Sequence, residues 1–124
     1  MTADELQFFD KLPQMLPLYI ALREKLDERY PDMTLKITKT QISFRNRHVF
    51  AMASLPMRRL KGWPREYLLV SFGLSHQKLS PRIAQSVEPY PGRWTHHVPI
   101  TAREDLDEEL LGWLDEAWQF ALYK

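Results

Sequence analysis

The chain has 124 residues, of which 44% are hydrophobic and 27% are charged, and it contains no cysteine. This size and composition are typical of one compact domain, so we expect a single α+β domain over residues 1–124. The lack of cysteine excludes disulfides, thiolate metal sites and cysteine nucleophiles, and favours the cytoplasm. The N-terminus is acidic and no apolar stretch is long enough to cross a bilayer, so we expect neither an export signal nor a membrane span.

Charge is divided along the chain, although the formal net charge is only +1. Residues 1–32 carry seven acids and four bases, residues 33–97 carry eleven bases and two acids, and residues 98–124 carry seven acids and two bases. The middle segment is therefore strongly positive and both ends are negative. Segregation of this size predicts a directional electrostatic field around the folded protein.

The N-terminal segment predicts two helices, because its apolar residues recur every three or four positions. Pro13 and Pro17 interrupt this pattern, since proline removes a backbone donor and clashes with the preceding turn. We therefore expect a short helix over residues 3–12, a break, and a longer helix over residues 16–29.

From Thr34 the apolar period changes to two, which is typical of strands. The apolar positions change parity between residues 35–37 and 42–44, so we expect a bulge or bend near Lys39 and Thr40. Further strands are expected over residues 49–55, 67–74 and 94–100.

Two long connections join these strands. Residues 56–64 are basic and predict a mobile hairpin loop, whereas residues 75–93 contain three prolines and Gly92. We expect a helical turn over residues 81–87, and long connections of this kind often carry function.

The last segment predicts a helix that begins at an Asp105 N-cap, with Glu108 three residues later. Its apolar stripe would dock on the sheet. The expected order is thus helix, four or five antiparallel strands, helix, in a two-layer α+β sandwich with both helices on one face. Much of the positive charge would then lie on the open sheet face or on the loops at its ends.

Four segments carry a resemblance to a known family: residues 39–45 (Lys-Thr-Gln-Ile-Ser-Phe-Arg), 50–51 (Phe-Ala), 80–82 (Ser-Pro-Arg) and 90–97 (Tyr-Pro-Gly-Arg-Trp-Thr-His-His). Through them the chain resembles, nearly end to end, an uncharacterised bacterial family of domains of unknown function, some of whose members are labelled predicted transport proteins. This resemblance implies no established chemistry.

A weaker similarity is to the YjbR-like family. It is confined to a tryptophan-led strand followed by an acidic cap and a helix that ends in an alanine-aromatic pair. It implies a frataxin-like α-β-α sandwich and a suggested DNA-binding role, which supports the architecture more than the activity.

The densest cluster of reactive groups is Tyr90 to His97. Adjacent strand residues point to opposite faces, so if Trp94 faces the core, His96 does too and His97 faces the open side. One interpretation is structural, with a tight turn, a core tryptophan and ordinary strand histidines. The other interpretation places Arg93 and one histidine beside an anion.

The sequence offers no metal or cofactor site and no catalytic signature. The four histidines lack zinc-site spacing, and carboxylates are almost absent from the strand region. There is no glycine-rich phosphate loop, no G-x-S-x-G and no H-E-x-x-H. We therefore expect a protein that is not an enzyme. A small enzyme using Tyr90, Arg93 and His97 is the least favoured alternative.

The leading hypothesis is a binding module that presents a basic sheet face or loop rim to a phosphorylated or carboxylated ligand, or to nucleic acid. Ser80 and Pro81 resemble a helix start, whose free N–H groups could hold an anion with Arg82. The candidate anion-binding residues are Lys39, Arg45, Ser80, Arg82, Tyr90, Arg93 and His97. The basic residues from Arg58 to Arg65 are expected to be solvated. The alternative is a protein-interaction domain or homodimer in which acidic helices meet a basic face.

Overall fold

A computed structural model describes all residues, 1–124. The helices are α1 (Ala3–Phe8), α2 (Leu16–Arg29) and α3 (Glu108–Tyr123). Three 3₁₀ turns accompany them: η1 (Phe9–Lys11), η2 (Pro13–Met15) and η3 (Arg103–Asp105). The strands are β1 (Thr34–Ile37), β2 (Ile42–Arg45), β3 (Val49–Ser54), β4 (Leu68–Leu74), β5 (Gln85–Tyr90) and β6 (Arg93–Ile100). None of the helices has the length and apolar character that crossing a bilayer requires.

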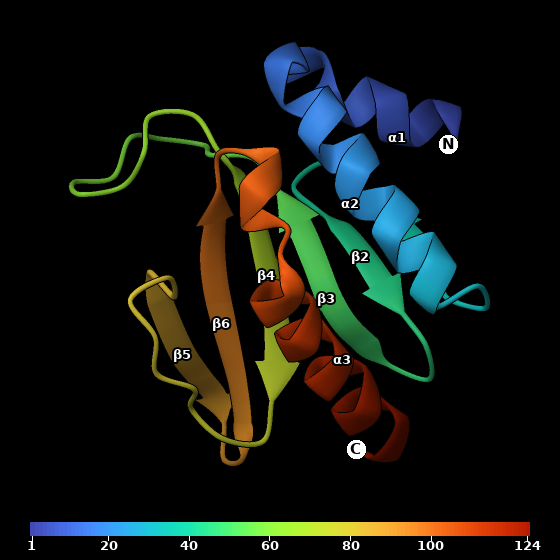
Figure 1. The fold of residues 1–124 in the computed structure, drawn as a ribbon, viewed down its shortest axis with the longest axis vertical. Coiled ribbons are helices and arrows are strands. Elements are labelled where there is room, and N and C mark those ends of the chain that lie inside the picture. Colours follow the sequence, from blue (N-terminus) through green and yellow to red (C-terminus); the bar gives the residue numbers. More distant parts are fainter.

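The six strands form one antiparallel sheet in the order β1-β2-β3-β4-β6-β5. In Figure 1, α2 crosses the sheet over β2 and α3 crosses it over β3 and β4, both on the same face. This confirms the two-layer α+β arrangement, with more strands than the four or five expected. The opposite face of the sheet carries no helix.

The additional strand, β5, lies where a helical turn was expected, and that expectation was wrong. Residues 85–90 form the sheet edge and all but Ser86 are exposed, so they lack the alternation of buried and exposed positions that marks a strand in sequence. Pro89 is tolerated because an edge strand can spare a backbone donor. Pro91 and Gly92 then make the turn into β6, and Gly92 adopts a positive φ of 74°.

The parity change near Lys39 comes from a full reversal of the chain. Lys39 lies in a turn in which the Thr38 N–H donates to the Gln41 carbonyl (2.9 Å), so that β1 and β2 form a hairpin. The apolar side chains of both strands remain on the helical side of the sheet.

The N-cap of α3 is Asp107 and not the expected Asp105. Asp107 Oδ1 accepts from the Leu110 N–H (3.0 Å), and the helix begins at the next residue. Asp105 instead stabilises the preceding turn, where its Oδ2 accepts from the Thr101 N–H (3.0 Å). Both acids have the sequence context of a cap, and only the path of the chain distinguishes them.

Aromatic packing joins the helical layer to the sheet. Tyr30, which follows α2, stacks on Trp118 of α3 with ring centroids 4.3 Å apart. Trp118 in turn meets Phe50 of β3 edge-on at 5.0 Å. The Tyr30 hydroxyl donates to Asp115 Oδ1 (2.8 Å), which ties the end of α2 to α3.

Glu5 is a fully buried carboxylate between α1 and α2. Its Oε2 accepts from the Tyr19 hydroxyl (2.5 Å) and from Arg23 Nε (2.8 Å), and its Oε1 accepts from the Thr2 N–H (2.9 Å). Burial alone would raise the pKa of Glu5. The hydrogen bonds from Arg23 and Tyr19 outweigh burial and lower this pKa to about 2.

Replacing Glu5 by glutamine should destabilise the protein by about 2–3 kcal/mol at pH 7, because Tyr19 and Arg23 lose a charged acceptor. The folded-state pKa lies below the unfolded value of 4.5, so this stabilisation is present above pH 4.5 and is lost as the pH falls towards 2. Urea unfolding at pH 7 and at pH 3 measures both effects.

The matched control is Asp4→Asn, which removes an exposed carboxylate from the same helical turn and should cost no more than about 0.5 kcal/mol. Equal losses in the two variants, or a Glu5→Gln effect that does not shrink in acid, would contradict a stabilising role for the buried network.

Candidate functional site

The open face of the sheet carries a row of side chains set by the strand register. Opposite residues of antiparallel strands share a face, so one row crosses all six strands. Its members are Lys36, Ser43, Met52, Ser71, His97 and Gln85. Apart from Met52 these residues are polar, as expected for a face without a covering layer.

His97 and Ser71 are joined within this row. Ser71 Oγ lies 2.7 Å from His97 Nδ1, and Ser71 is only 3% exposed. The placement of His97 on the open side, predicted from strand alternation, is confirmed. Burial lowers the pKa of His97, so its ring is neutral at pH 7 in the free protein.

His96, which precedes His97 in β6, is part of the core. His96 is fully buried on the helical side and stacks on Phe72 with centroids 4.9 Å apart. Its Nε2 accepts from the Lys78 N–H (2.8 Å), which requires the neutral ring with the proton on Nδ1. Burial is the main cause that lowers the pKa of His96.

The β3–β4 loop, residues 55–67, and the adjacent end of the open face enclose a hollow of about 250 Å³. We call it the loop hollow. Arg58, Trp63 and Tyr67 line it from the loop side, and Leu69, Gln85 and His97 line it from the sheet. The rings of Trp63 and Tyr67 lie 5.6 Å apart and form an aromatic wall. A guanidinium and an imidazole thus share one hollow with two aromatic rings.

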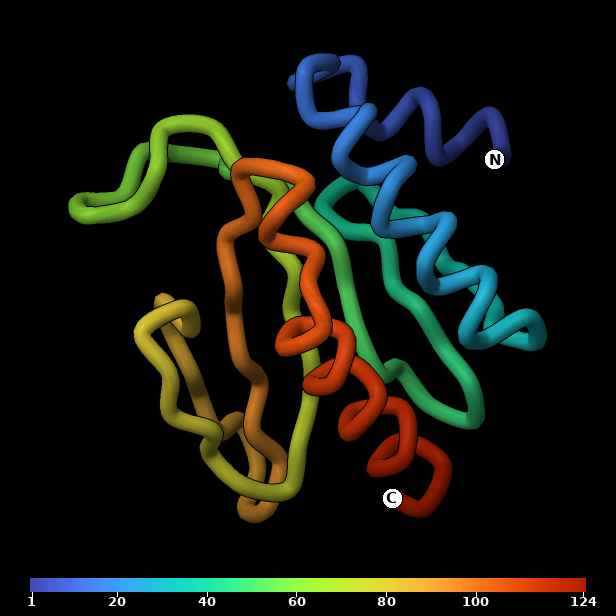
Figure 2. Tube along the Cα trace, viewed as in Figure 1, coloured from blue at the N-terminus to red at the C-terminus, as the bar shows by residue number.

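Six cations gather at the same end of the sheet, where the β1–β2 turn and the β3–β4 loop lie. We call this set the basic rim: Lys11, Lys39, Arg58, Arg59, Lys61 and Arg65. Figure 2 shows the loop, in green, projecting from this end. None of the six forms an ion pair with a carboxylate. Glu66, the one acid in the loop, accepts from the Gln14 amide instead.

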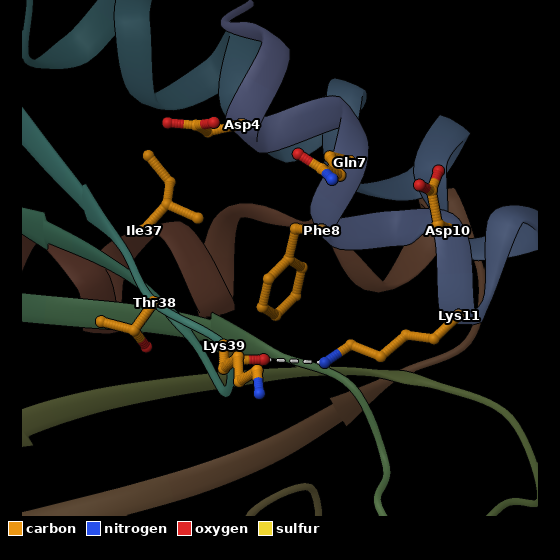
Figure 3. A pocket seen from close by; sticks show the side chains of 8 residues that line it. All are labelled: Asp4, Gln7, Phe8, Asp10, Lys11, Ile37, Thr38 and Lys39. Atoms are coloured by element: carbon orange, nitrogen blue, oxygen red, sulfur yellow. Dashed lines mark hydrogen bonds between the residues drawn. The ribbon is translucent and has the colours of Figure 1, made fainter.

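A second hollow, of about 530 Å³, lies between α1 and the β1–β2 turn (Figure 3). The Lys11 ammonium reaches across it to donate to the Lys39 carbonyl (2.8 Å) and lies over the Phe8 ring at 4.6 Å. Asp4 and Asp10 also line this hollow, so both signs of charge are present. Its chemistry favours no single class of ligand.

Arg82 does not belong to an anion site. Its guanidinium donates to Asp107 Oδ1 (2.8 Å), to Glu109 Oε1 (3.0 Å) and to the Asp105 carbonyl (2.7 Å). Burial would lower the pKa of Arg82, but the two carboxylates outweigh burial and raise it. Arg82 therefore anchors the β4–β5 connection to the start of α3.

The predicted helix start at Ser80 is absent. Ser80 Oγ accepts from the Arg82 N–H (3.2 Å) within a turn, and no helix follows. An anion site at a helix N-terminus therefore cannot form at this point. The sequence pattern of serine followed by proline is shared by caps and turns, and here it marks a turn.

Three other predicted residues lie at the opposite end of the sheet. Arg45 ends β2, while Tyr90 and Arg93 flank the β5–β6 turn. Arg93 lies over the Phe120 ring at 5.5 Å, and Tyr90 is largely exposed. His97 lies four positions after Arg93 along β6, or about 13 Å of strand.

The seven predicted residues therefore do not form one site. The structure brings Lys39 and His97 to the rim end and places Arg45, Tyr90 and Arg93 at the opposite end. Arg82 lines a surface hollow with Lys61 near the rim, but its guanidinium is occupied by carboxylates. The cations of the β3–β4 loop are exposed, as predicted. The sequence reasoning did not find that Arg58 lines a hollow with His97. The available signal was a tryptophan, Trp63, within a run of loop cations.

Arg82→Gln should lower the free energy of unfolding by about 1 kcal/mol, because it removes a partly exposed cation from two carboxylates. Arg45→Gln, which removes a cation that has no ion pair, should change stability by less than about 0.5 kcal/mol. Urea unfolding of both variants gives the comparison. Equal stability of the two would refute the anchoring role of Arg82.

Comparison with known proteins agrees with a domain that spans nearly the whole chain. No curated protein and no solved structure matches the sequence. One family matches, described as a domain of unknown function (DUF5655), and the match covers residues 5–121. The chain belongs to this family of domains of unknown function.

Proposed function

We propose that this protein is a non-enzymatic binding module whose basic rim holds an anionic partner. The observation that carries the proposal is that six cations from three segments gather at one end of the sheet without carboxylate partners. The family resemblance adds no chemistry to this argument. A cytoplasmic location, expected from the lack of cysteine, belongs to the same proposal.

All of the ion pairs lie outside the rim. All carboxylate partners serve four other cations, which are Arg23, Arg29, Lys78 and Arg82. Like charges held close together repel one another, and a bound anion would relieve this repulsion. Such a patch also raises the rate at which an anionic partner is captured.

The residue types favour oxyanions. Three of the six rim residues are arginines, whose planar guanidinium matches carboxylate and phosphate oxygens with two parallel hydrogen bonds. The loop offers one half-buried aromatic ring, Trp63, and not the series of platforms that binds successive bases of a single strand. A phosphorylated or carboxylated ligand therefore suits the rim better than an extended nucleic acid. The DNA-binding role implied by the YjbR-like similarity remains an alternative.

Charge reversal at the rim tests the proposal. The wild-type protein should be retained on heparin at low salt, because heparin presents dense anionic groups, and should elute at moderate salt. Arg59→Glu combined with Arg65→Glu should abolish retention. Arg45→Glu combined with Arg47→Glu makes the same change in net charge at the opposite end and should leave most of the retention intact.

Loss of retention in both double variants would show that only net charge matters and would contradict a localised site. No retention of the wild-type protein at low salt would also overturn the proposal. A dimer that dissolves with salt, seen by sedimentation in a protein that binds no anion, would support the self-associating interaction domain instead.

A further inference from the structure

The Ser71–His97 pair joins a buried hydroxyl to a half-buried imidazole, and the two side chains form no hydrogen bond beyond the one between them. His97 Nδ1 is taken by the Ser71 hydroxyl, and no protein atom bonds Nε2. Among side-chain nitrogen and oxygen atoms without a partner, only Nδ1 of His96 is fully buried. Nε2 of His97, which also has no partner, is therefore accessible to solvent. Ser71 holds the His97 ring at Nδ1, and Nε2 is free to form a hydrogen bond with a ligand.

The Ser71 hydroxyl allows His97 to present a donor. When the hydroxyl donates to Nδ1, the proton of the neutral ring lies on Nε2. When the ring is protonated, both nitrogens carry protons and the hydroxyl accepts from Nδ1. In either state Nε2 offers an N–H, and the bond to Ser71 is kept. At 3% exposure in a central strand, the hydroxyl itself is too enclosed to act as a nucleophile, so Ser71 is a positioning residue.

The loop hollow is amphiphilic. Half of its twelve lining residues are hydrophobic, and Trp63 and Tyr67 supply an aromatic wall. Arg58, which has no ion-pair partner, lines the same hollow as His97. A bare inorganic anion would use the Arg58 guanidinium and the His97 imidazole and leave the Trp63 ring in contact with water. A ligand with an apolar ring and an acidic group would use both.

We infer that the loop hollow binds a small single-ring ligand that carries a phosphate or carboxylate, with its ring against Trp63 and its oxyanion between Arg58 and His97. The volume of about 250 Å³ lies below the usual range for drug-sized ligands, which begins near 300 Å³, and restricts the ligand to one ring. This inference rests on the proposed function and names the ligand class for the part of the rim that Arg58 occupies.

Calorimetric titration with four probes tests the ligand class: phenyl phosphate, benzoate, inorganic phosphate and benzyl alcohol. Phenyl phosphate or benzoate should bind at millimolar concentration or below. Inorganic phosphate lacks the ring and benzyl alcohol lacks the charge. Each should bind at least about tenfold more weakly, because each loses either the aromatic contact or the charge-assisted hydrogen bonds. Equal affinity for inorganic phosphate would overturn the inference.

Variants locate the site. Arg58→Gln and His97→Ala should each weaken phenyl phosphate binding about tenfold, through loss of a charge-assisted hydrogen bond. Arg47→Gln, which removes an exposed cation at the opposite end of the sheet, should change it less than about twofold. Ser71→Ala should cost about threefold through the orientation of His97, whereas Thr95→Ala, on the same face but outside the hollow, should cost nothing measurable.

Ligand binding in the loop hollow and anion binding at the rim can be refuted separately. Heparin retention with no binding of either ring-bearing acid would remove the inference and leave the proposed function standing. Binding of phenyl phosphate that Arg47→Gln weakens as much as Arg58→Gln would also refute the hollow as its site. Urea unfolding of each variant verifies folding. Arg58→Gln changes an exposed side chain and keeps the test decisive even if His97→Ala is unstable.

Discussion

Both long helices pack on one face of a single antiparallel sheet, and the arrangement of charge and polar groups depends on this one-sided cover. A core of aliphatic and aromatic side chains holds it, in which Tyr30 and Trp118 stack on each other and meet Phe50 edge-on. Because side chains alternate along each strand, covering one face places most polar strand residues on the other. The open face is thus a consequence of core packing, available for binding without any cost to the core.

His96 and His97 show how finely this division operates. Two adjacent residues of the same type, separated only by the strand pleat, have different environments. One is a neutral core ring that caps the Lys78 N–H, and the other turns towards a hollow lined by Arg58. Burial lowers the pKa of both, although only His97 lines the loop hollow. Position relative to the sheet decides what the same side chain does.

Sequence periodicity predicts the layers well and the site poorly, for physical reasons. The placement of His97 follows from strand alternation, a local rule that needs no tertiary information. β5 escapes detection because an exposed edge strand with Pro89 lacks the buried alternation that marks strands. In the sequence, Arg82 looks like a cation that is free to bind an anion. In the fold, the Asp107 carboxylate pairs with it. The loop hollow depends on where residues 55–67 lie over the sheet, which no local pattern specifies.

The central claim is that anion recognition is localised at one end of the sheet. Backbone amide chemical-shift mapping with a short polyphosphate at low salt tests it most directly. The account predicts shifts confined to residues 10–12, 38–41 and 54–69 and to Gln85 and His97, which contribute the rim and the hollow. Comparable shifts at residues 45–47 and 90–93, at the opposite end of the sheet, or no shifts anywhere, would contradict it.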